Sequence, residues 1–240
     1  MNRISTGIKG FDELVEGGFP EGSTVLVAGL PGAGKTIFGL QFIYNGAMNG
    51  ENGVYICIES SPAELREQAS MFGMDFNALE EQGKVEFLRI PKGNVRFNLF
   101  QLISKAVEGV KAERIVFDNI ATYVVSLGRY VSLWDEMFKA PEADKKENSL
   151  TDDKAAVYSI IEQLKSLGRT CLVITHGDAS GARISSDGMS EYLCDGIIKI
   201  DIVELGREPT RIIKVAKMRQ TKNILQLREF EITQRGIEIS

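Results

Sequence analysis

The stretch Gly29-Leu-Pro-Gly-Ala-Gly-Lys-Thr36 is the most informative part of this sequence, because it indicates both the fold class and the position of a binding site. It matches the pattern G-x-x-x-x-G-K-[ST] at every position, and it lies between a short apolar run (23–28) and a helix-like apolar run (36–48). In this setting glycines let the backbone curl, so that successive N–H groups and the start of the helix face phosphate oxygens. The alternative is a glycine-rich turn with an incidental lysine. Such a turn would not need the full motif spacing or a position between a strand and a helix. The motif therefore predicts a loop that binds nucleotide phosphates.

The last two side chains of this loop indicate which ligand it binds. Lys35 is expected to reach the β- and γ-phosphates, and Thr36 to offer its hydroxyl group to Mg²⁺. We therefore expect ATP or ADP as the bound nucleotide, with Mg²⁺ as the metal. The residues expected to bind the nucleotide in this segment are Gly29, Leu30, Pro31, Gly32, Ala33, Gly34, Lys35 and Thr36.

Apolar strand-like runs alternate with helix-like segments through most of the chain. Strands that are apolar along their whole length and separated by helices indicate a parallel sheet covered on both faces, hence an α/β fold. The strand-like runs are residues 23–28, 54–58, 85–90, 114–117 and 170–175, and the helix-like segments are residues 36–48, 62–72, 97–110 and 154–167.

The pattern changes after Gly196. Four short apolar runs follow at residues 197–203, 212–215, 230–232 and 237–239, the first two around a loop with turn residues. They favour an antiparallel extension on one edge of the sheet. Because we find no internal repeat and no linker, we expect a single domain over residues 1–240.

Two carboxylates follow apolar strands. Asp118 comes directly after the run at 114–117, and Glu59 after the run at 54–58. Ligands of open α/β sheets bind at the carboxyl ends of the strands. Asp118 is therefore expected to hold Mg²⁺, and Glu59 to accept a proton from a water that attacks the γ-phosphate. The alternative for each is a helix cap, for Glu59 at the helix that begins near Pro62.

Composition excludes several classes of protein. The chain has 28 Lys and Arg against 33 Asp and Glu, a net charge of −5, without the basic excess typical of nucleic-acid-coating proteins. No apolar run approaches the ~20 residues that span a bilayer, and the start lacks an apolar signal core, so a cytoplasmic protein is expected. Cys57, Cys171 and Cys194 are too few and too far apart for a disulfide framework or a zinc knuckle.

Residues 127–153 depart from the pattern. This stretch is charged and broken by proline, it holds the only tryptophan, Trp134, and residues 129–153 contain four basic and seven acidic side chains. It is either a solvated surface insertion or a lid or partner-binding loop. Its acidic excess disfavours nucleic acid as the partner.

Together these residues resemble the RecA superfamily of P-loop NTPases, and within it the KaiC-like ATPases. The resemblance implies a RecA-like fold and ATP hydrolysis, and it covers roughly residues 3–126 and 154–240. KaiC has two adjacent glutamates where this chain has Glu59 and Ser60, so Glu59 alone must act and slow turnover is expected. Besides the phosphate loop, the segments that carry the resemblance are residues 6–13 (TGIKGFDE), 17–18 (GG), 41–46 (QFIYNG) and 59–62 (ESSP).

The resemblance also implies a ring. KaiC-like domains assemble as rings, usually hexamers, with ATP between neighbours and a Lys-x-Arg that contacts the neighbour's nucleotide. Lys217 and Arg219 occupy that place here, where an arginine finger would meet the γ-phosphate; the alternative is two solvated charges on an edge strand. The other residues that align with nucleotide-proximal positions are Met218, Thr221, Asn223, Thr233 and Gln234.

Two further positions are interpreted through the resemblance. His176 ends a strand where RecA-like proteins often place a polar residue that senses the γ-phosphate, and a neutral ring suffices for that role. A structural histidine is the alternative. Glu191 and Tyr192 stand where KaiC has an adjacent Ser-Thr pair that becomes phosphorylated, so no autophosphorylation cycle is expected.

Three functions remain open at this point. The first is a Mg²⁺-dependent ATPase acting as a ring-shaped switch or signalling module with an unidentified protein partner. The second is a DNA repair or recombination ATPase similar to RadA and RecA paralogues, and the third is a scaffold that binds ATP without turnover. Residues 177–188 carry one arginine against two aspartates, whereas DNA binding needs several cations. We therefore expect neither nucleic acid nor a membrane as a partner.

Overall fold

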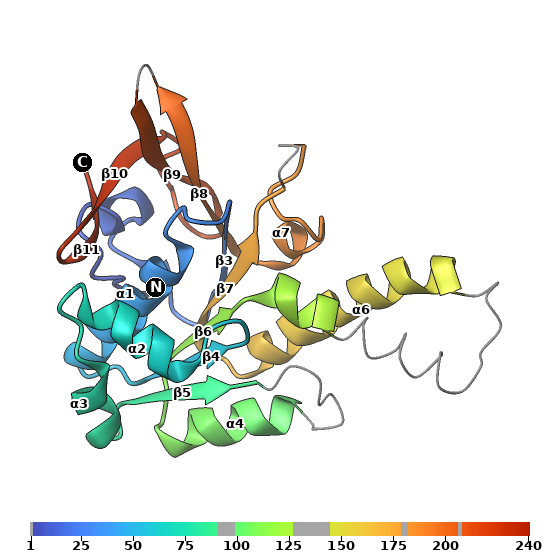
Figure 1. Cartoon of the computed structure of the whole chain (residues 1–240), viewed down its shortest axis with the longest axis horizontal. Helices are drawn as coiled ribbons and strands as arrows, with labels where there is room; N and C mark the ends of the chain where they lie inside the picture. The colour runs from blue at the N-terminus through green and yellow to red at the C-terminus, as the bar shows by residue number, and fades with distance from the viewer. Residues whose placement is uncertain (1, 91–98, 127–144, 179–181, 206–207) are drawn as a thin grey trace.

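The computed structural model describes residues 2–90, 99–126, 145–178, 182–205 and 208–240. These residues form a nine-stranded sheet with the order β11-β10-β9-β8-β3-β7-β6-β4-β5 (Figure 1). The strands are β3 (Thr24–Gly29), β4 (Gly53–Cys57), β5 (Val85–Arg89), β6 (Arg114–Asp118), β7 (Thr170–His176), β8 (Gly196–Leu205), β9 (Glu208–Met218), β10 (Arg228–Thr233) and β11 (Gly236–Ile239).

The sheet combines a parallel body with an antiparallel extension. In spatial order, the strands β8, β3, β7, β6, β4 and β5 all run parallel, and β3 pairs with both β7 and β8. β9, β10 and β11 then add antiparallel partners on one side. The predicted α/β fold with a C-terminal antiparallel extension is confirmed. A separate small sheet pairs β1 (Arg3–Ile4) with β2 (Phe19–Pro20).

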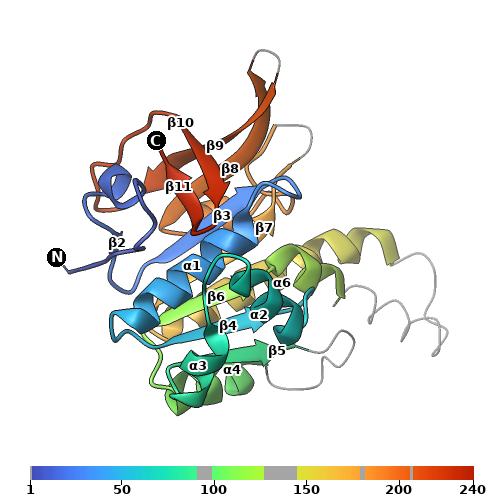
Figure 2. The same ribbon diagram turned by 60° about the vertical axis from the view of Figure 1, so that its left-hand side comes forward.

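Helices cover both faces of the large sheet, as Figure 2 shows from a second side. One apolar core lies under α1 (Lys35–Met48), α2 (Pro62–Ser70) and α3 (Phe76–Glu81). The other lies under α4 (Leu99–Gly109), the helical residues 120–126 and α6 (Lys145–Ser166). Burial on both faces explains why the strands are apolar along their whole length.

The helix α6 begins earlier than the sequence pattern predicted. Its expected start was residue 154, but it begins at Lys145, so the last part of the predicted insertion is helical. The spacing of apolar residues gave no signal there, whereas Lys, Glu and Leu favour a helix without one. Residues 127–144, with Trp134, lie outside the described part of the chain. No helix within the described ranges, α6 included, is long and apolar enough to cross a membrane.

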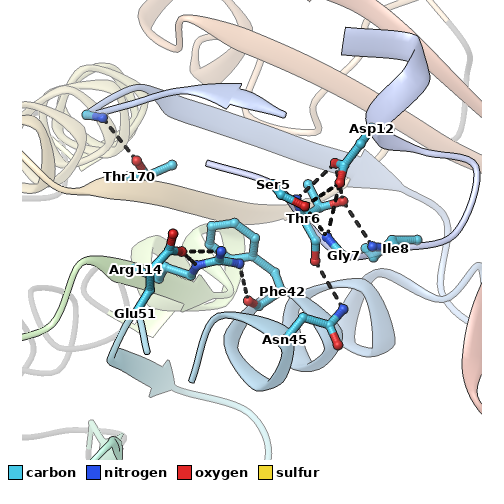
Figure 3. Close-up of polar contacts among 11 residues, drawn as sticks. Ser5, Thr6, Gly7, Ile8, Asp12, Phe42, Asn45, Glu51, Arg114 and Thr170 are labelled. Carbon is cyan, nitrogen blue, oxygen red and sulfur yellow. Dashed lines mark hydrogen bonds and ion pairs between the residues drawn. The ribbon is translucent and has the colours of Figure 1, made fainter. Parts of the chain in front are cut away.

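Two polar clusters fasten α1 to its surroundings (Figure 3). In the first, the carboxylate of Asp12 accepts hydrogen bonds from the Ser5 hydroxyl (2.6 Å) and from the amide (2.9 Å) and hydroxyl (2.6 Å) of Thr6. The side-chain amide of Asn45 on α1 then donates to the Thr6 carbonyl (3.1 Å). This cluster holds the segment before β3 against the middle of the helix.

The second cluster surrounds Arg114 at the amino end of β6. Its buried guanidinium lies 4.6 Å from the Phe42 ring centre, donates to the Phe42 carbonyl (2.8 Å) and pairs with Glu51. A Cβ atom on Gly46 would lie 2.3 Å from the Arg114 Nε, so α1 passes the arginine only because this position has no side chain. The phosphate loop thus leads into a helix that is fixed along its length.

Candidate functional site

The four neighbouring parallel strands β3, β7, β6 and β4 end on the same side of the sheet (Figure 1). A predicted site residue lies in or just after each of these strand ends. β3 runs into the loop at residues 29–36, β4 precedes Glu59, β6 ends at Asp118 and β7 ends at His176. Because β3, β7, β6 and β4 are consecutive in the sheet, their carboxyl ends meet. The structure therefore brings together the residues that the sequence predicted from strand ends.

Two glycines of the loop occupy positions where a side chain does not fit. A Cβ atom on Gly29 would lie 1.8 Å from the carbonyl oxygen of Ile200, and Gly34 has a φ of +113°. L side chains rarely adopt that φ, so Gly34 fulfils a backbone requirement at the start of α1. Leu30 is exposed at the edge of the loop, together with Pro31 and Gly32, whereas Ala33 is buried.

Lys35 folds back onto the loop. Its Nζ atom donates to the carbonyl oxygens of Gly29 (2.8 Å) and Leu30 (2.9 Å), and the residue is 8% exposed. Burial lowers the pKa of Lys35, while the nearby carboxylates act in the opposite direction, Asp118 most strongly and Glu59 next. The site thus holds one buried cation beside two carboxylates.

Asp118 accepts two hydrogen bonds on the same carboxylate oxygen. The Thr36 hydroxyl donates to Oδ2 over 2.9 Å, and the Tyr55 hydroxyl donates to it over 2.7 Å. Burial raises the pKa of Asp118, and these two hydrogen bonds act against that effect. Sequence reasoning missed Tyr55, which stands in an apolar strand; the available signal was that a buried tyrosine hydroxyl needs a partner.

The structure excludes the capping alternatives for both acids. The cap of α2 is Ser61, whose hydroxyl accepts from the Glu64 amide while the Glu64 carboxylate accepts from the Ser61 amide. The helix at residues 120–126 begins at Asn119, whose Oδ1 accepts from the Thr122 amide (2.8 Å). Glu59 and Asp118 therefore cap neither helix.

Glu59 is held by groups from two other strand ends. Its Oε1 accepts a hydrogen bond from the Thr122 hydroxyl and lies 3.5 Å from the His176 Nε2. Partial burial by itself would raise the pKa of Glu59, but hydrogen bonds from Thr122 and Asn119 outweigh it. The imidazole acts in the same direction, so the pKa of Glu59 lies below its ordinary value.

His176 lies between Glu59 and the end of β6. Its Nε2 is 3.5 Å from the side-chain nitrogen of Asn119, which adjoins Asp118. Its Nδ1 is buried and has no hydrogen-bond partner among the described residues. The ring thus connects Glu59 to the strand that carries the metal-binding candidate, a position compatible with sensing a phosphate and with a structural role.

Lys217 and Arg219 lie near the amino ends of the parallel strands, whereas the phosphate loop lies at their carboxyl ends. The Arg219 guanidinium pairs with Asp195 (3.0 Å), whose other carboxylate oxygen accepts from the Thr24 amide (3.1 Å) at the first residue of β3. The Lys217 ammonium donates to the Cys194 carbonyl (2.7 Å). Since β3 has six residues, it separates the two groups of residues by roughly 20 Å. Neither cation reaches the loop of its own chain.

Three further predicted nucleotide-contact residues lie near this pair. Met218 is buried against Gly196, so its side chain belongs to the core. Thr221 accepts from the Arg3 guanidinium (3.1 Å), and Asn223 donates to the Val215 carbonyl (3.0 Å). They share the edge with Lys217 and Arg219, away from the loop.

Thr233 and Gln234 lie in the turn between β10 and β11. Thr233 is within hydrogen-bond distance of the Gly236 carbonyl (3.2 Å), and Gln234 is exposed. The hairpin packs against the loop side of the molecule, because the Cδ1 of Ile232 lies 3.5 Å from where a Cβ on Gly34 would stand. The turn itself lies beside Gln41 on α1, because a Cβ atom on Gly236 would stand 2.5 Å from the Gln41 Cδ.

Comparisons with known proteins extend over the whole chain. The family model described as "ATPase: KaiC" matches residues 4–240. A UPF0273 protein of Thermotoga maritima is 32% identical, covering 100% of this chain and 96% of the relative. The circadian clock oscillator protein KaiC of a Nostoc species is 28% identical, and the alignment covers all of this chain but 44% of that protein.

A solved structure has the same fold. The crystal structure of a KaiC-like protein from Pyrococcus horikoshii matches with a TM-score of 0.83 and 32% sequence identity, covering 100% of this chain and 99% of the other. The similarity includes the antiparallel extension, since both chains are covered nearly end to end. The chain therefore has a KaiC-like fold of the RecA type, and the strand ends described above are part of that fold.

Proposed function

The chain belongs to the KaiC family of ATPases, and on this premise we propose that it binds ATP with Mg²⁺ at residues 29–36 and hydrolyses it to ADP and phosphate. The observation that carries the proposal is the meeting of Lys35, Thr36, Asp118 and Glu59 at the carboxyl ends of adjacent strands. These are a cation for the phosphates, two oxygen groups for a metal ion and a base for water.

The residues present fit Mg²⁺. The Thr36 hydroxyl and the Asp118 carboxylate are oxygen donors 2.9 Å apart, and Mg²⁺ prefers a few oxygen ligands from the protein plus water and phosphates. Across the described residues no cluster of three or more His, Cys, Asp or Glu offers a closed metal cage. When bound, the metal ion would supply positive charge to the β- and γ-phosphate oxygens.

Glu59 is the group that we assign to water activation. Its carboxylate is half-exposed at the same strand edge, and its lowered pKa keeps it ionised at neutral pH. An ionised carboxylate within reach of an attacking water can take the proton as the bond to phosphorus forms. Lys35 contributes by binding phosphate charge rather than by moving a proton.

We further propose that the nucleotide lies between subunits of a ring, with Lys217 and Arg219 reaching the site of the neighbour. Their place at the far edge of the sheet supports this reading, because neither reaches residues 29–36 of its own chain. In such an assembly a change in the nucleotide would alter the contacts between subunits. The role proposed for the protein is therefore a nucleotide-driven switch in a signalling or regulatory process.

Phosphate release tests the enzymatic part of the proposal. The purified full chain, given ATP and Mg²⁺, is expected to release phosphate; Glu59→Gln is expected to lower the rate on the order of 10²- to 10⁴-fold while ATP binding is retained. Lys35→Ala is expected to lose ATP binding in calorimetry. Glu67→Gln is the matched control, since it makes the same chemical change on an exposed face of α2.

Two results would contradict the proposal. Unchanged ATP affinity in Lys35→Ala would place the nucleotide elsewhere. ATP binding without phosphate release by the parent chain would leave the scaffold function instead.

A further inference from the structure

We propose that Thr122 is a positioning residue that holds the carboxylate of Glu59 in place for water activation. This inference rests on the proposed function, because it concerns how the ATPase site is kept in working order. Thr122 was not among the residues singled out from the sequence, and its role follows from a contact between two segments that are far apart in the chain.

The contact joins the ends of two strands. Thr122 belongs to the helix that follows β6, and Glu59 follows β4; the hydroxyl of the first donates to the Oε1 of the second. The His176 Nε2 approaches the same Oε1 from β7. Thr122 and His176 both engage Oε1, and the Asn119 side chain adds a further hydrogen bond to the same carboxylate.

Thr122 is itself rigidly placed. Its amide donates to the Asn119 side chain, which starts the helix, and Ile120 and Val124 anchor the helix in the core with exposures of 0% and 5%. A hydroxyl on the first turn of an anchored helix has a fixed position. It therefore restricts the orientation of the Glu59 carboxylate, although the Glu59 side chain is 45% exposed.

Glu59 needs such a restraint. A glutamate side chain that is half in solvent has several rotamers, and most of them turn the carboxylate away from the site. A misplacement of about 1 Å at a reacting group can cost about 100-fold in rate. Removing the hydroxyl should therefore lower the rate of hydrolysis without changing how ATP binds.

The test compares Thr122→Val, which keeps the shape but loses the hydroxyl, with Thr122→Ser, which keeps the hydroxyl. In the full chain Thr122→Val should lower kcat about 10- to 100-fold. Its KM, and its Kd for a non-hydrolysable ATP analogue, should stay within about twofold of the parent, because Thr122 does not line the loop. Thr122→Ser should retain most of the rate of the parent. Thr122→Ala carries the same test if the valine variant does not fold, since alanine favours a helix.

A double-mutant cycle assigns the effect to Glu59. In the Glu59→Gln background Thr122→Val should cause no further loss, because residues that act as one unit are not additive. An unchanged or higher kcat in Thr122→Val, a failure of serine to restore it, or an additive loss in the double variant would overturn the inference while the ATPase itself stands. Absence of hydrolysis in the parent chain would overturn the proposed function, and this inference with it.

Discussion

At the scale of single residues, the carboxylate of Asp118, the proposed metal ligand, is stabilised by a neighbouring side chain that is assigned no part in the reaction itself. Tyr55 is fully buried, and its hydroxyl donates to the Asp118 Oδ2. The hydrogen bond stabilises the ionised carboxylate and opposes the effect of burial on its pKa. A buried carboxylate without this donor holds a cation less well, because its charge is less well solvated and its orientation less restricted.

Replacing Tyr55 by phenylalanine is therefore expected to raise the Mg²⁺ concentration needed for half-maximal activity. The change removes one oxygen atom, and a lost hydrogen bond to a charged group is worth about 1.5–3 kcal/mol, which corresponds to roughly 10-fold or more in metal affinity. Titration of ATPase activity with Mg²⁺ at saturating ATP measures it. Tyr158→Phe on the exposed side of α6 is the control. The same half-maximal concentration in both variants would contradict the assignment of Asp118 to the metal.

At the scale of elements, the end of the chain is fastened to the helix that follows the phosphate loop. The Gln41 side chain on α1 accepts from the Ile237 amide (2.7 Å) and donates to the carbonyls of Arg235 (3.2 Å) and Ile237 (3.3 Å). Gly236 permits this approach, since a Cβ atom there would lie 2.5 Å from the Gln41 Cδ. The turn with Thr233 and Gln234 is positioned by this contact.

Gln41→Met is expected to lower the free energy of unfolding by about 1–3 kcal/mol. Methionine fills a similar volume, but the buried amide and carbonyl groups of β11 lose their partner, and an unsatisfied buried polar group costs that amount. Urea denaturation of the parent and the variant measures the difference. The same change at the exposed Gln82 should have little effect on stability. Equal losses in the two variants would show that the hydrogen bonds of Gln41 do not stabilise the fold.

At the scale of the whole molecule, the phosphate loop follows the carboxyl end of β3, whereas Arg219 pairs with Asp195 near the amino end of the same strand. If Arg219 acts as an arginine finger in the proposed ring, it must therefore act on a neighbouring subunit. Mixing two inactive variants tests this: Lys35→Ala subunits keep Arg219, and Arg219→Ala subunits keep the loop. Mixed rings should recover activity at interfaces that pair the two intact halves, and specific activity should rise with protein concentration as the rings assemble.

The control for this experiment is Arg169→Ala, an exposed arginine before β7, which should behave like the parent. If rings shown to contain both variants recover no activity, Arg219 does not complete the neighbour's site. If Arg219→Ala alone is as active as the parent, the guanidinium serves only its ion pair with Asp195.

The features that depend on residues close together in the chain could be predicted from the sequence. The loop at residues 29–36 requires glycines and a lysine at a set spacing, and apolar runs reveal buried strands wherever the chain packs on both faces. The prediction that Asp118 and Glu59 lie at one edge followed from the rule that parallel strands share an end. These inferences needed no knowledge of which strands are adjacent.

The contacts between residues far apart in the chain became known only from the folded structure. The hydrogen bonds from Tyr55 to Asp118 and from Thr122 to Glu59 depend on β4 lying beside β6 in one register, with Cys57 opposite Asp118. Likewise, the antiparallel return of β9 is what carries Arg219 to the edge away from the loop. Strand order and register are set by the packing of the whole core, so a local sequence pattern does not contain them.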